Sequence, residues 1–177
     1  MRYAMAIDTR KCVGCSDCVV ACQDENFVPL GFCRDWIQET VEGEYPIVNV
    51  EYRSERCNHC ENSPCVRCCP TAASHYEEGG IVKVTPNKCI GCGACVESCP
   101  YDARYVHPDG HIDKCTFCHH RVVKGENPAC VSVCPTECMY FGDLDDPQSA
   151  LSILLKKRKT KVLLSEAGTG PQVYYLI

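Results

Sequence analysis

The chain has 177 residues, of which 19 are cysteine, and its formal net charge is -5 at neutral pH. The hydrophobic fraction of 45% counts these cysteines, so the apolar core is thin and another kind of bond must help to stabilise the fold. The acidic balance argues against nucleic acid as a partner. No apolar run approaches the length of about 20 residues that spans a bilayer, and the start lacks the apolar core of a signal peptide.

The cysteines follow a spacing that indicates metal binding. Groups one and three have the pattern C-x2-C-x2-C-x3-C, which is typical of bacterial ferredoxins with [4Fe–4S] clusters. In two-cluster ferredoxins the first three cysteines of a group bind one cluster and the fourth binds the other. The sequence therefore predicts four [4Fe–4S] clusters and sixteen ligands. The groups are Cys12, Cys15, Cys18 and Cys22; Cys57, Cys60, Cys65 and Cys69; Cys89, Cys92, Cys95 and Cys99; and Cys115, Cys118, Cys130 and Cys134.

Three other interpretations of the cysteines are weaker. A disulfide framework is disfavoured by the odd cysteine count and the length of the chain. Structural zinc sites use paired C-x2-C knuckles separated by a longer spacer, a description that suits only group four. Decay of one group is disfavoured because every group retains its four cysteines.

The chain also repeats itself. The segment around Lys11-Cys12 resembles the segment around Lys88-Cys89, and the endings of groups two and four resemble each other. This order predicts an α+β fold of small strands and short helices, with two ferredoxin-like modules around the clusters. Residues 57–105 would form an inner module, residues 1–56 and 106–146 an outer module, and residues 147–177 a C-terminal helix and extension for docking.

Exchange of the fourth cysteines within each module predicts how the ligands are divided among the clusters. Cys68 competes with Cys69, but the other groups all have a three-residue gap before the last cysteine, which favours Cys69. Cys33, Cys68 and Cys138 are then interpreted as small apolar fillers. The predicted sets are Cys12, Cys15, Cys18 and Cys134; Cys115, Cys118, Cys130 and Cys22; Cys57, Cys60, Cys65 and Cys99; and Cys89, Cys92, Cys95 and Cys69.

Groups that could surround the clusters are also visible. Backbone N–H groups near Gly14 and Gly91 would offset the negative charge of the clusters. His59 and the pair His119-His120 adjoin ligands and are candidates to donate hydrogen bonds to cluster sulfurs, although surface histidines are an equal alternative. With enough cysteines for four cubanes, no histidine is needed as a ligand.

Local patterns predict several regular elements. Residues 73–77 and 81–85 flank Gly79-Gly80 as a β-hairpin, and residues 3–7 and 139–141 would pair as strands. The segment 23–56 is interpreted as a long loop that returns through a strand at 47–52, either to contact a partner or to cover the clusters of the chain. Asp146 as N-cap and Pro147 at the first position predict a helix to about Lys157. No dinucleotide or phosphate loop is recognisable.

Taken together, these motifs resemble those of the four-cluster iron–sulfur subunits of the molybdopterin oxidoreductase family. This type is found in polysulfide, thiosulfate and dimethyl sulfoxide reductases and in formate-dependent nitrite reductase. The resemblance covers nearly the whole chain. Its strings include Lys11-Cys12-Val13-Gly14-Cys15, Cys57-Asn58-His59-Cys60-Glu61-Asn62, Cys99-Pro100-Tyr101-Asp102-Ala103-Arg104 and Phe141-Gly142-Asp143-Leu144-Asp145-Asp146-Pro147.

The resemblance implies an electron-transfer subunit without catalytic activity of its own. Such subunits dock on a large catalytic subunit with a molybdenum or tungsten bis-pyranopterin and on a membrane subunit that reacts with quinone. They lie on either face of the membrane, held there by their partners. The alternatives are a free polyferredoxin that carries electrons between enzymes, and an assembly protein with structural clusters.

Overall fold

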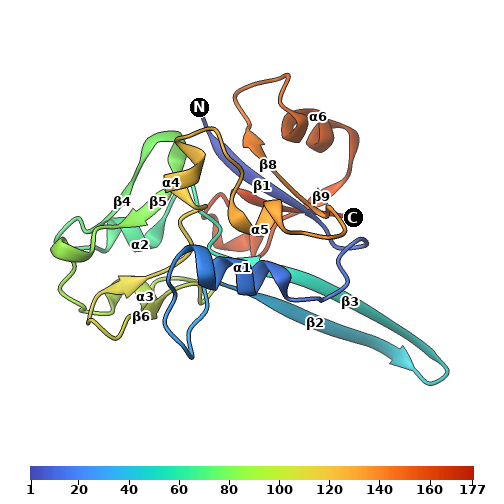
Figure 1. The fold of residues 1–177 in the computed structure, drawn as a ribbon, viewed down its shortest axis with the longest axis horizontal. Coiled ribbons are helices and arrows are strands. Elements are labelled where there is room, and N and C mark those ends of the chain that lie inside the picture. Colours follow the sequence, from blue (N-terminus) through green and yellow to red (C-terminus); the bar gives the residue numbers. More distant parts are fainter.

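The fold is described by a computed structural model of all residues 1–177, and it is a mixed structure of strands and short helices, as the sequence predicted (Figure 1). The strands are β1 (Tyr3–Asp8), β2 (Asp35–Glu44), β3 (Ile47–Arg56), β4 (Ser74–Tyr76), β5 (Val82–Val84), β6 (Tyr105–Val106), β7 (Ile112–Asp113), β8 (Met139–Asp143), β9 (Thr160–Lys161) and β10 (Val173–Leu176). The helices are α1 (Asp17–Glu25), α2 (Pro64–Arg67), α3 (Ala94–Glu97), α4 (His119–Val122), α5 (Ala129–Ser132) and α6 (Ala150–Lys157), and short 3-10 turns lie at Glu78–Gly80, Pro86–Lys88 and Ser165–Ala167.

A four-stranded sheet with the order β8-β1-β10-β9 joins the two ends of the chain. The predicted pairing of residues 3–7 with 139–141 is confirmed, because β1 and β8 are antiparallel with Ile7 opposite Met139. The strand β10 was missed: it pairs parallel to β1, with Met5 opposite Val173, and its Leu176 is fully buried. Part of the C-terminal segment grouped as a docking extension is therefore core.

A long β-hairpin, β2 and β3, projects from the body of the molecule (Figure 1). The predicted strand at 47–52 is confirmed and longer than expected, but the interpretation of the preceding residues as loop is wrong for β2. Ten paired positions run from Asp35 opposite Arg56 to Glu44 opposite Ile47. The base is buried and the far end is exposed, so β2 lacks the buried alternation that identifies a strand.

The other local predictions are partly confirmed. The β4–β5 hairpin forms where expected, with His75 opposite Lys83. Helix α6 begins later than predicted, because Ser149 is its N-cap and its hydroxyl accepts a hydrogen bond from the Ser152 N–H at 3.1 Å. Asp146 accepts from the N–H of Gln148 in the turn before the helix. Proline at 147 therefore belongs to that turn and not to the first helical position.

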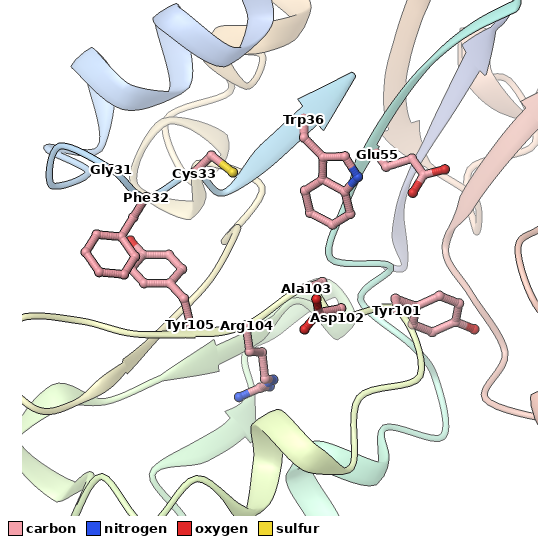
Figure 2. A pocket seen from close by; sticks show the side chains of 10 residues that line it. All are labelled: Gly31, Phe32, Cys33, Trp36, Glu55, Tyr101, Asp102, Ala103, Arg104 and Tyr105. Atoms are coloured by element: carbon pink, nitrogen blue, oxygen red, sulfur yellow. The ribbon is translucent and has the colours of Figure 1, made fainter. Parts of the chain in front are cut away.

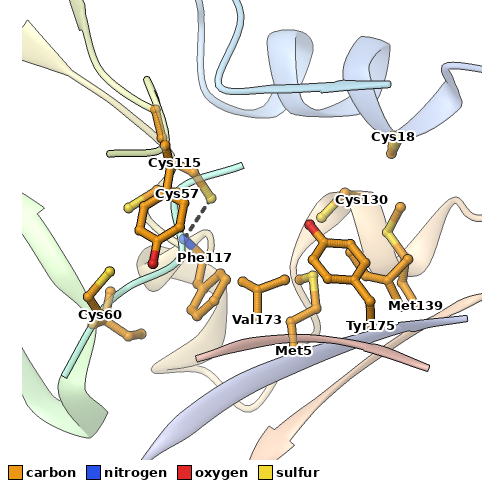
Figure 3. Packing of buried hydrophobic residues seen from close by; sticks show 14 of the residues in the cluster. Met5, Cys18, Cys57, Cys60, Cys115, Phe117, Cys130, Met139, Val173 and Tyr175 are labelled. Atoms are coloured by element: carbon orange, nitrogen blue, oxygen red, sulfur yellow. Dashed lines mark hydrogen bonds between the residues drawn. The ribbon is translucent and has the colours of Figure 1, made fainter. Parts of the chain in front are cut away.

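The interior is divided between apolar side chains and sulfur. Helix α6 covers one side of the sheet through Leu151, which packs with Ala4, Ala6 and Leu176. The larger cluster of buried residues lies on the other side and includes Met5, Ile7, Tyr175 and several cysteines. Figure 3 shows cysteines and apolar side chains meeting in this cluster. The sheet thus forms one wall of the cysteine-rich part.

Candidate iron–sulfur sites

The same left-handed turn occurs in all four cysteine groups. The residue before the second cysteine has a positive φ in each: 69° at Gly14, 43° at His59, 65° at Gly91 and 51° at Phe117. Glycine adopts this conformation without strain, whereas a side chain is rarely found there. Tyr52 lies so near Gly14 that a Cβ there would be 2.7 Å from the tyrosine ring. The repeat seen in the sequence therefore extends to the backbone.

A short helix follows each of these turns and carries the third cysteine of the group. That cysteine is the second residue of α1, α2, α3 or α5, and a valine follows it every time. A second positive φ, of 52°, 49° and 48°, occurs three residues after the fourth cysteine in groups two, three and four. The cysteines of the helices are Cys18, Cys65, Cys95 and Cys130.

Two cavities bring together the cysteines predicted for the outer module. We call them site 1 and site 2. Site 1 is lined by Cys12, Cys15, Cys18 and Cys134, together with Cys138. Site 2 is lined by Cys22, Cys115, Cys118 and Cys130. In both, the fourth cysteine of one group faces the first three of the other, which is the predicted exchange.

The cysteines predicted for the third cluster also lie together, and we call them site 3. The charges of Cys57, Cys65 and Cys99 all act on Cys60, and burial is the main cause that raises the pKa of the Cys60 thiol to about 11. Site 3 therefore again combines three cysteines of one group with the last cysteine of another.

The fourth set, site 4, is only partly assembled by the contacts. Cys89 acts on Cys95, and so does Cys68. Cys69 instead repeats the surroundings of Cys134 in site 1. The N–H of Ser74 donates to the Cys69 sulfur at 3.4 Å, and that of Cys138 donates to Cys134 at 3.4 Å. Cys92 is exposed, and site 4 is the predicted set of Cys69, Cys89, Cys92 and Cys95.

The four sites lie in a row in which each is next to the one that follows. Helix α1 carries Cys18 of site 1 and Cys22 of site 2 one turn apart. Cys115 of site 2 is close enough for the charge of Cys57 in site 3 to act on it, and the two appear side by side in Figure 3. Site 3 and site 4 meet through Cys65 and Cys95, which share one buried cluster.

The two ends of the row differ from its centre. Site 1 includes the exposed Cys15 and site 4 includes the exposed Cys92, whereas every cysteine of site 2 is buried. Burial raises the pKa of Cys115 to about 12 and that of Cys130 to about 11. These groups would be neutral thiols without a metal, so binding of a cluster must displace their protons.

Several sulfurs already accept hydrogen bonds from the backbone, as cluster ligands do. The Ile112 N–H donates to Cys89 at 3.4 Å, and the Phe117 N–H donates to Cys115 at 3.4 Å (Figure 3). Burial opposes ionisation of Cys69, but the N–H of Ser74 and the hydroxyl of Thr71 outweigh it and lower the pKa of that thiol. The chain thus favours the thiolate at Cys69 before any metal binds.

Buried donors without an acceptor provide a test of whether a cluster fits. The structure leaves Nε of Arg56, Nε and Nη1 of Arg104, Nδ2 of Asn58 and Nε2 of His59 buried and unpaired. Buried polar groups are almost always paired, and these lie among the cysteines. A sulfide-rich anionic cluster supplies the missing acceptors, so the residues fit [4Fe–4S] clusters.

Of the predicted histidines, His59 keeps its Nε2 buried and free for a cluster sulfur, as predicted, and His120 lies at the surface, as the alternative has it. His59 accepts a hydrogen bond from the Val82 N–H at 3.1 Å and stacks on Phe117 at 3.7 Å between ring centroids. These two rings occupy the left-handed turns of groups two and four and hold them against each other. His120 pairs with Glu25 at 2.6 Å. Neither histidine has a hydrogen bond to a cysteine sulfur.

The three remaining cysteines are not alike. Cys138 is buried and lines site 1, 3.4 Å from the sulfur of Cys134, which agrees with the prediction of a small filler. Cys33 and Cys68 are exposed, so the prediction that they fill the interior is wrong. Cys33 follows Phe32 and Cys68 follows Arg67, and such neighbours do not distinguish exposed positions from buried ones.

A surface cleft of about 490 Å³ lies beside site 3 (Figure 2). Its walls are the segment 31–36 on one side and residues 101–105 on the other. Phe32 and Tyr105 stack across one end, with 4.9 Å between ring centroids. None of the sixteen predicted ligands lines this cleft. In addition, the chain has no helix with the length and apolar character needed to traverse a bilayer.

Comparison with known proteins agrees with this geometry. Residues 48–144 match the model of a family described as a 4Fe-4S dicluster domain. The chain is 45% identical to a tetrathionate reductase subunit of Salmonella typhimurium, over 99% of this chain and 72% of that protein. It is 41% identical to a polysulfide reductase chain of Wolinella succinogenes, over 98% and 93%. It is 37% identical to the arsenate respiratory reductase iron–sulfur subunit of a Shewanella species, over 99% and 96%.

The chain thus belongs to the family of iron–sulfur subunits of respiratory molybdopterin oxidoreductases. Its cofactors are [4Fe–4S] clusters, and its 19 cysteines are enough for four. It is an electron-transfer component of a reductase complex and not a catalyst alone. These findings favour the subunit over the free polyferredoxin.

Proposed function

We propose that each of sites 1 to 4 binds one [4Fe–4S] cluster through its four cysteines, and that single electrons pass from site to site along the row. Each bound cluster stores or releases one electron. The chain fixes the order of the sites through α1, through the contact of Cys57 with Cys115, and through the shared surroundings of Cys65 and Cys95. For site 4, Cys69 is the proposed ligand because its hydrogen bonds repeat those of Cys134.

The partition supports the two modules proposed from the sequence. Sites 1 and 2 exchange their fourth cysteines within residues 1–56 and 106–146, and sites 3 and 4 do so within residues 57–105. The shared turn and helix of all four groups support a ferredoxin-like repeat. The small β6–β7 hairpin connects the modules, since Tyr105 pairs with Asp113.

The main support for this function is that, among the sixteen cysteines, only one at each end of the row is exposed. Cys15 and Cys92 reach the surface, while site 2 and most of site 3 are enclosed. Electrons must therefore enter at one end and leave at the other. We propose that one end meets a large molybdenum or tungsten bis-pyranopterin subunit and the other a membrane subunit that reacts with quinone.

The projecting β2–β3 hairpin adjoins site 1 and supports a partner there. Paired residues of a hairpin lie on one face, and its outer part has an apolar face of Val41, Val48 and Val50, all exposed. The base of that face continues inward through Ile37, which lines site 1. The hairpin thus combines the two interpretations of this segment: its base covers site 1, and its outer end is free to contact a partner.

The terminal substrate is a matter for the catalytic partner. The named relatives belong to reductases of tetrathionate, polysulfide and arsenate. We propose that this chain delivers electrons to, or receives them from, a catalytic subunit for a related sulfur or arsenic compound.

The test is anaerobic purification of the intact complex from its host. We expect about sixteen iron and sixteen sulfide per chain, from four clusters with four iron atoms each, together with molybdenum or tungsten and a large partner. Substitution of Cys15→Ser or Cys92→Ser should alter one cluster signal in electron paramagnetic resonance. Cys33→Ser is the matched control, because Cys33 is an exposed cysteine outside all sites.

Three outcomes would contradict the proposal. The same iron content with no partner and no molybdenum or tungsten would indicate a free carrier. Zinc with little iron would exclude the cluster assignment. A change of two signals in the Cys15→Ser variant would contradict the division of ligands among the sites.

A further inference from the structure

Three cations are buried in the interior of this molecule, away from water. They are Arg56, Lys114 and Arg104, with exposed fractions of 1%, 1% and 4%. A buried charge is unfavourable unless it is paired, and only one carboxylate, Asp35, reaches any of them, at 3.7 Å from Arg56. Lys114 and Arg104 have no carboxylate partner at all. Apart from Asp35, the negative charge that these cations face comes from the cysteines of the four sites.

Arg56 lies between site 1 and site 2. Its Nη1 donates to the sulfur of Cys130 at 2.9 Å, and its Nη2 donates to Ser54. The hydroxyl of Ser54 in turn lies 3.7 Å from the sulfur of Cys18 in site 1. Burial opposes its charge, but Cys130 of site 2, Asp35, Cys115 of site 2 and Cys18 of site 1 act to raise the pKa of Arg56.

Lys114 lies between site 2 and site 3. Its Nζ donates to the carbonyl groups of Val82 and Cys115. Burial, together with the charge of Arg104, lowers the pKa of Lys114, and Cys57 and Cys65 of site 3 and Cys115 of site 2 act in the opposite direction. It touches no sulfur directly, so the backbone holds it at this junction.

Arg104 lies between site 3 and site 4. Its Nη2 donates to the sulfur of Cys65 at 2.8 Å and to the hydroxyl of Ser74 at 3.0 Å. Cys65 and Cys57 of site 3 and Cys95 of site 4 act on its charge. Arg104 also lines the surface cleft, and Figure 2 shows its side chain pointing away from Trp36. Its Nε and Nη1 have no acceptor in the protein.

We propose that these three side chains form a series of buried cations, one at each junction of the row, that sets the potentials of the two clusters on either side. Reduction adds one negative charge to a cluster, so a fixed positive charge nearby stabilises the reduced state and raises its potential. Because each cation faces two sites, it favours the electron on both. In each transfer one cluster is oxidised and the next reduced, and the cation between the two stabilises the electron on either side.

The sequence contains a matched comparison for this role. A basic residue precedes the first cysteine of every group: Lys11, Arg56, Lys88 and Lys114. Arg56 and Lys114 are buried at junctions, whereas Lys11 and Lys88 are exposed at the ends of the row. Water and salt screen exposed charges. The two buried residues should therefore affect the cluster potentials more than Lys11 and Lys88 do, although all four occupy the same position in the motif.

The inference rests on the proposed division of the clusters, and its test uses the intact complex. Midpoint potentials are measured by redox titration followed with electron paramagnetic resonance, with the signals of sites 1 and 4 marked by the Cys15→Ser and Cys92→Ser variants. Arg104→Gln should lower the potentials at sites 3 and 4 and leave site 1 unchanged. Arg56→Gln should lower those at sites 1 and 2 and leave site 4 unchanged. Lys88→Gln, the control, should shift site 4 far less than Arg104→Gln does.

Variants that keep or reverse the charge separate this role from a structural one. Arg104→Lys should retain most of the potential, and Asp35→Asn should raise the potentials at sites 1 and 2, since it removes the carboxylate beside Arg56. Should a Gln variant lose iron, these two decide the matter. Equal shifts at all four sites, no shift in variants with full iron content, or no rise with Asp35→Asn would overturn the inference. Such a result, with sixteen iron and the partners present, would leave the proposed function intact.

Discussion

The sheet and the cysteine-rich part of this molecule are stabilised in different ways. The sheet has an ordinary apolar interior, in which Ala4, Ala6, Leu151 and Leu176 are at most 1% exposed. Apart from α1 and the β2–β3 hairpin, the cysteine-rich part has helices of four residues and strands of two or three, and its interior holds sulfur and cations. Of 79 backbone hydrogen bonds, 47 lie outside regular elements. The first part depends on hydrophobic burial, and the second depends on its metal.

Removal of iron should have the largest effect, and it should affect the cysteine-rich part much more than the sheet. Without clusters, thiols of high pKa and unpaired cations would face each other in sites 2 and 3, so the cysteine-rich part should lose its structure. Limited proteolysis and hydrogen exchange of the iron-free chain should show cleavage and loss of protection between residues 57 and 134. Reconstitution with iron and sulfide should restore both. A compact iron-free chain that resists protease would contradict this.

Leu151→Ala should weaken the sheet part specifically. Leu151 is buried on the side of α6 that packs against the sheet. Truncation of such a leucine to alanine typically lowers the free energy of unfolding by about 2–5 kcal/mol. Chemical denaturation of the purified protein should show this loss with the iron content unchanged. Ile153→Ala on the same helix is the control, because Ile153 is 36% exposed and its loss should be much smaller. A loss of iron in the Leu151→Ala variant would show that the two parts are not separable.

Gly91→Ala should weaken the cysteine-rich part through the backbone. A Cβ at Gly91 would lie 2.3 Å from the carbonyl oxygen of Gly110, in addition to the cost of about 1–2 kcal/mol for a left-handed alanine. We expect reduced iron at site 4. Gly93→Ala has the same backbone requirement, with φ of 77°, but no atom within 4 Å, and should retain more iron. Equal losses in both variants would mean that the close contact with Gly110 is unimportant.

The smallest effect is expected at the surface of the cysteine-rich part. Glu25 accepts hydrogen bonds from His120 and Arg121, each at 2.6 Å, and thereby connects α1 with α4. All three side chains are partly exposed, and such pairs contribute only about 0.2–1 kcal/mol. Glu25→Gln should change the free energy of unfolding by no more than this, without loss of iron. A larger loss would indicate that this connection holds site 2 in place.

Features that depend on residues close together in the sequence could be predicted, and features that depend on distant segments could not. Spacing within a group is local, so the cysteine groups and the β4–β5 hairpin were predictable. The strand β10 was missed because its pairing with β1 joins the two ends of the chain. The role of Arg56 was missed because its motif position equals that of Lys88, which is exposed. Burial arises from the packing of distant segments, which spacing does not record.

The order of strands in the sheet has a consequence for biosynthesis. β1 is made well before both of its neighbours in the sheet, β8 and β10. Site 1 and site 2 also combine early and late cysteines, whereas sites 3 and 4 need only residues 57–99. Cluster insertion can therefore begin in the middle of the chain while the first strand still waits for a partner. During that interval β1 exposes an unpaired apolar edge, a stage at which a chaperone would have a segment to bind.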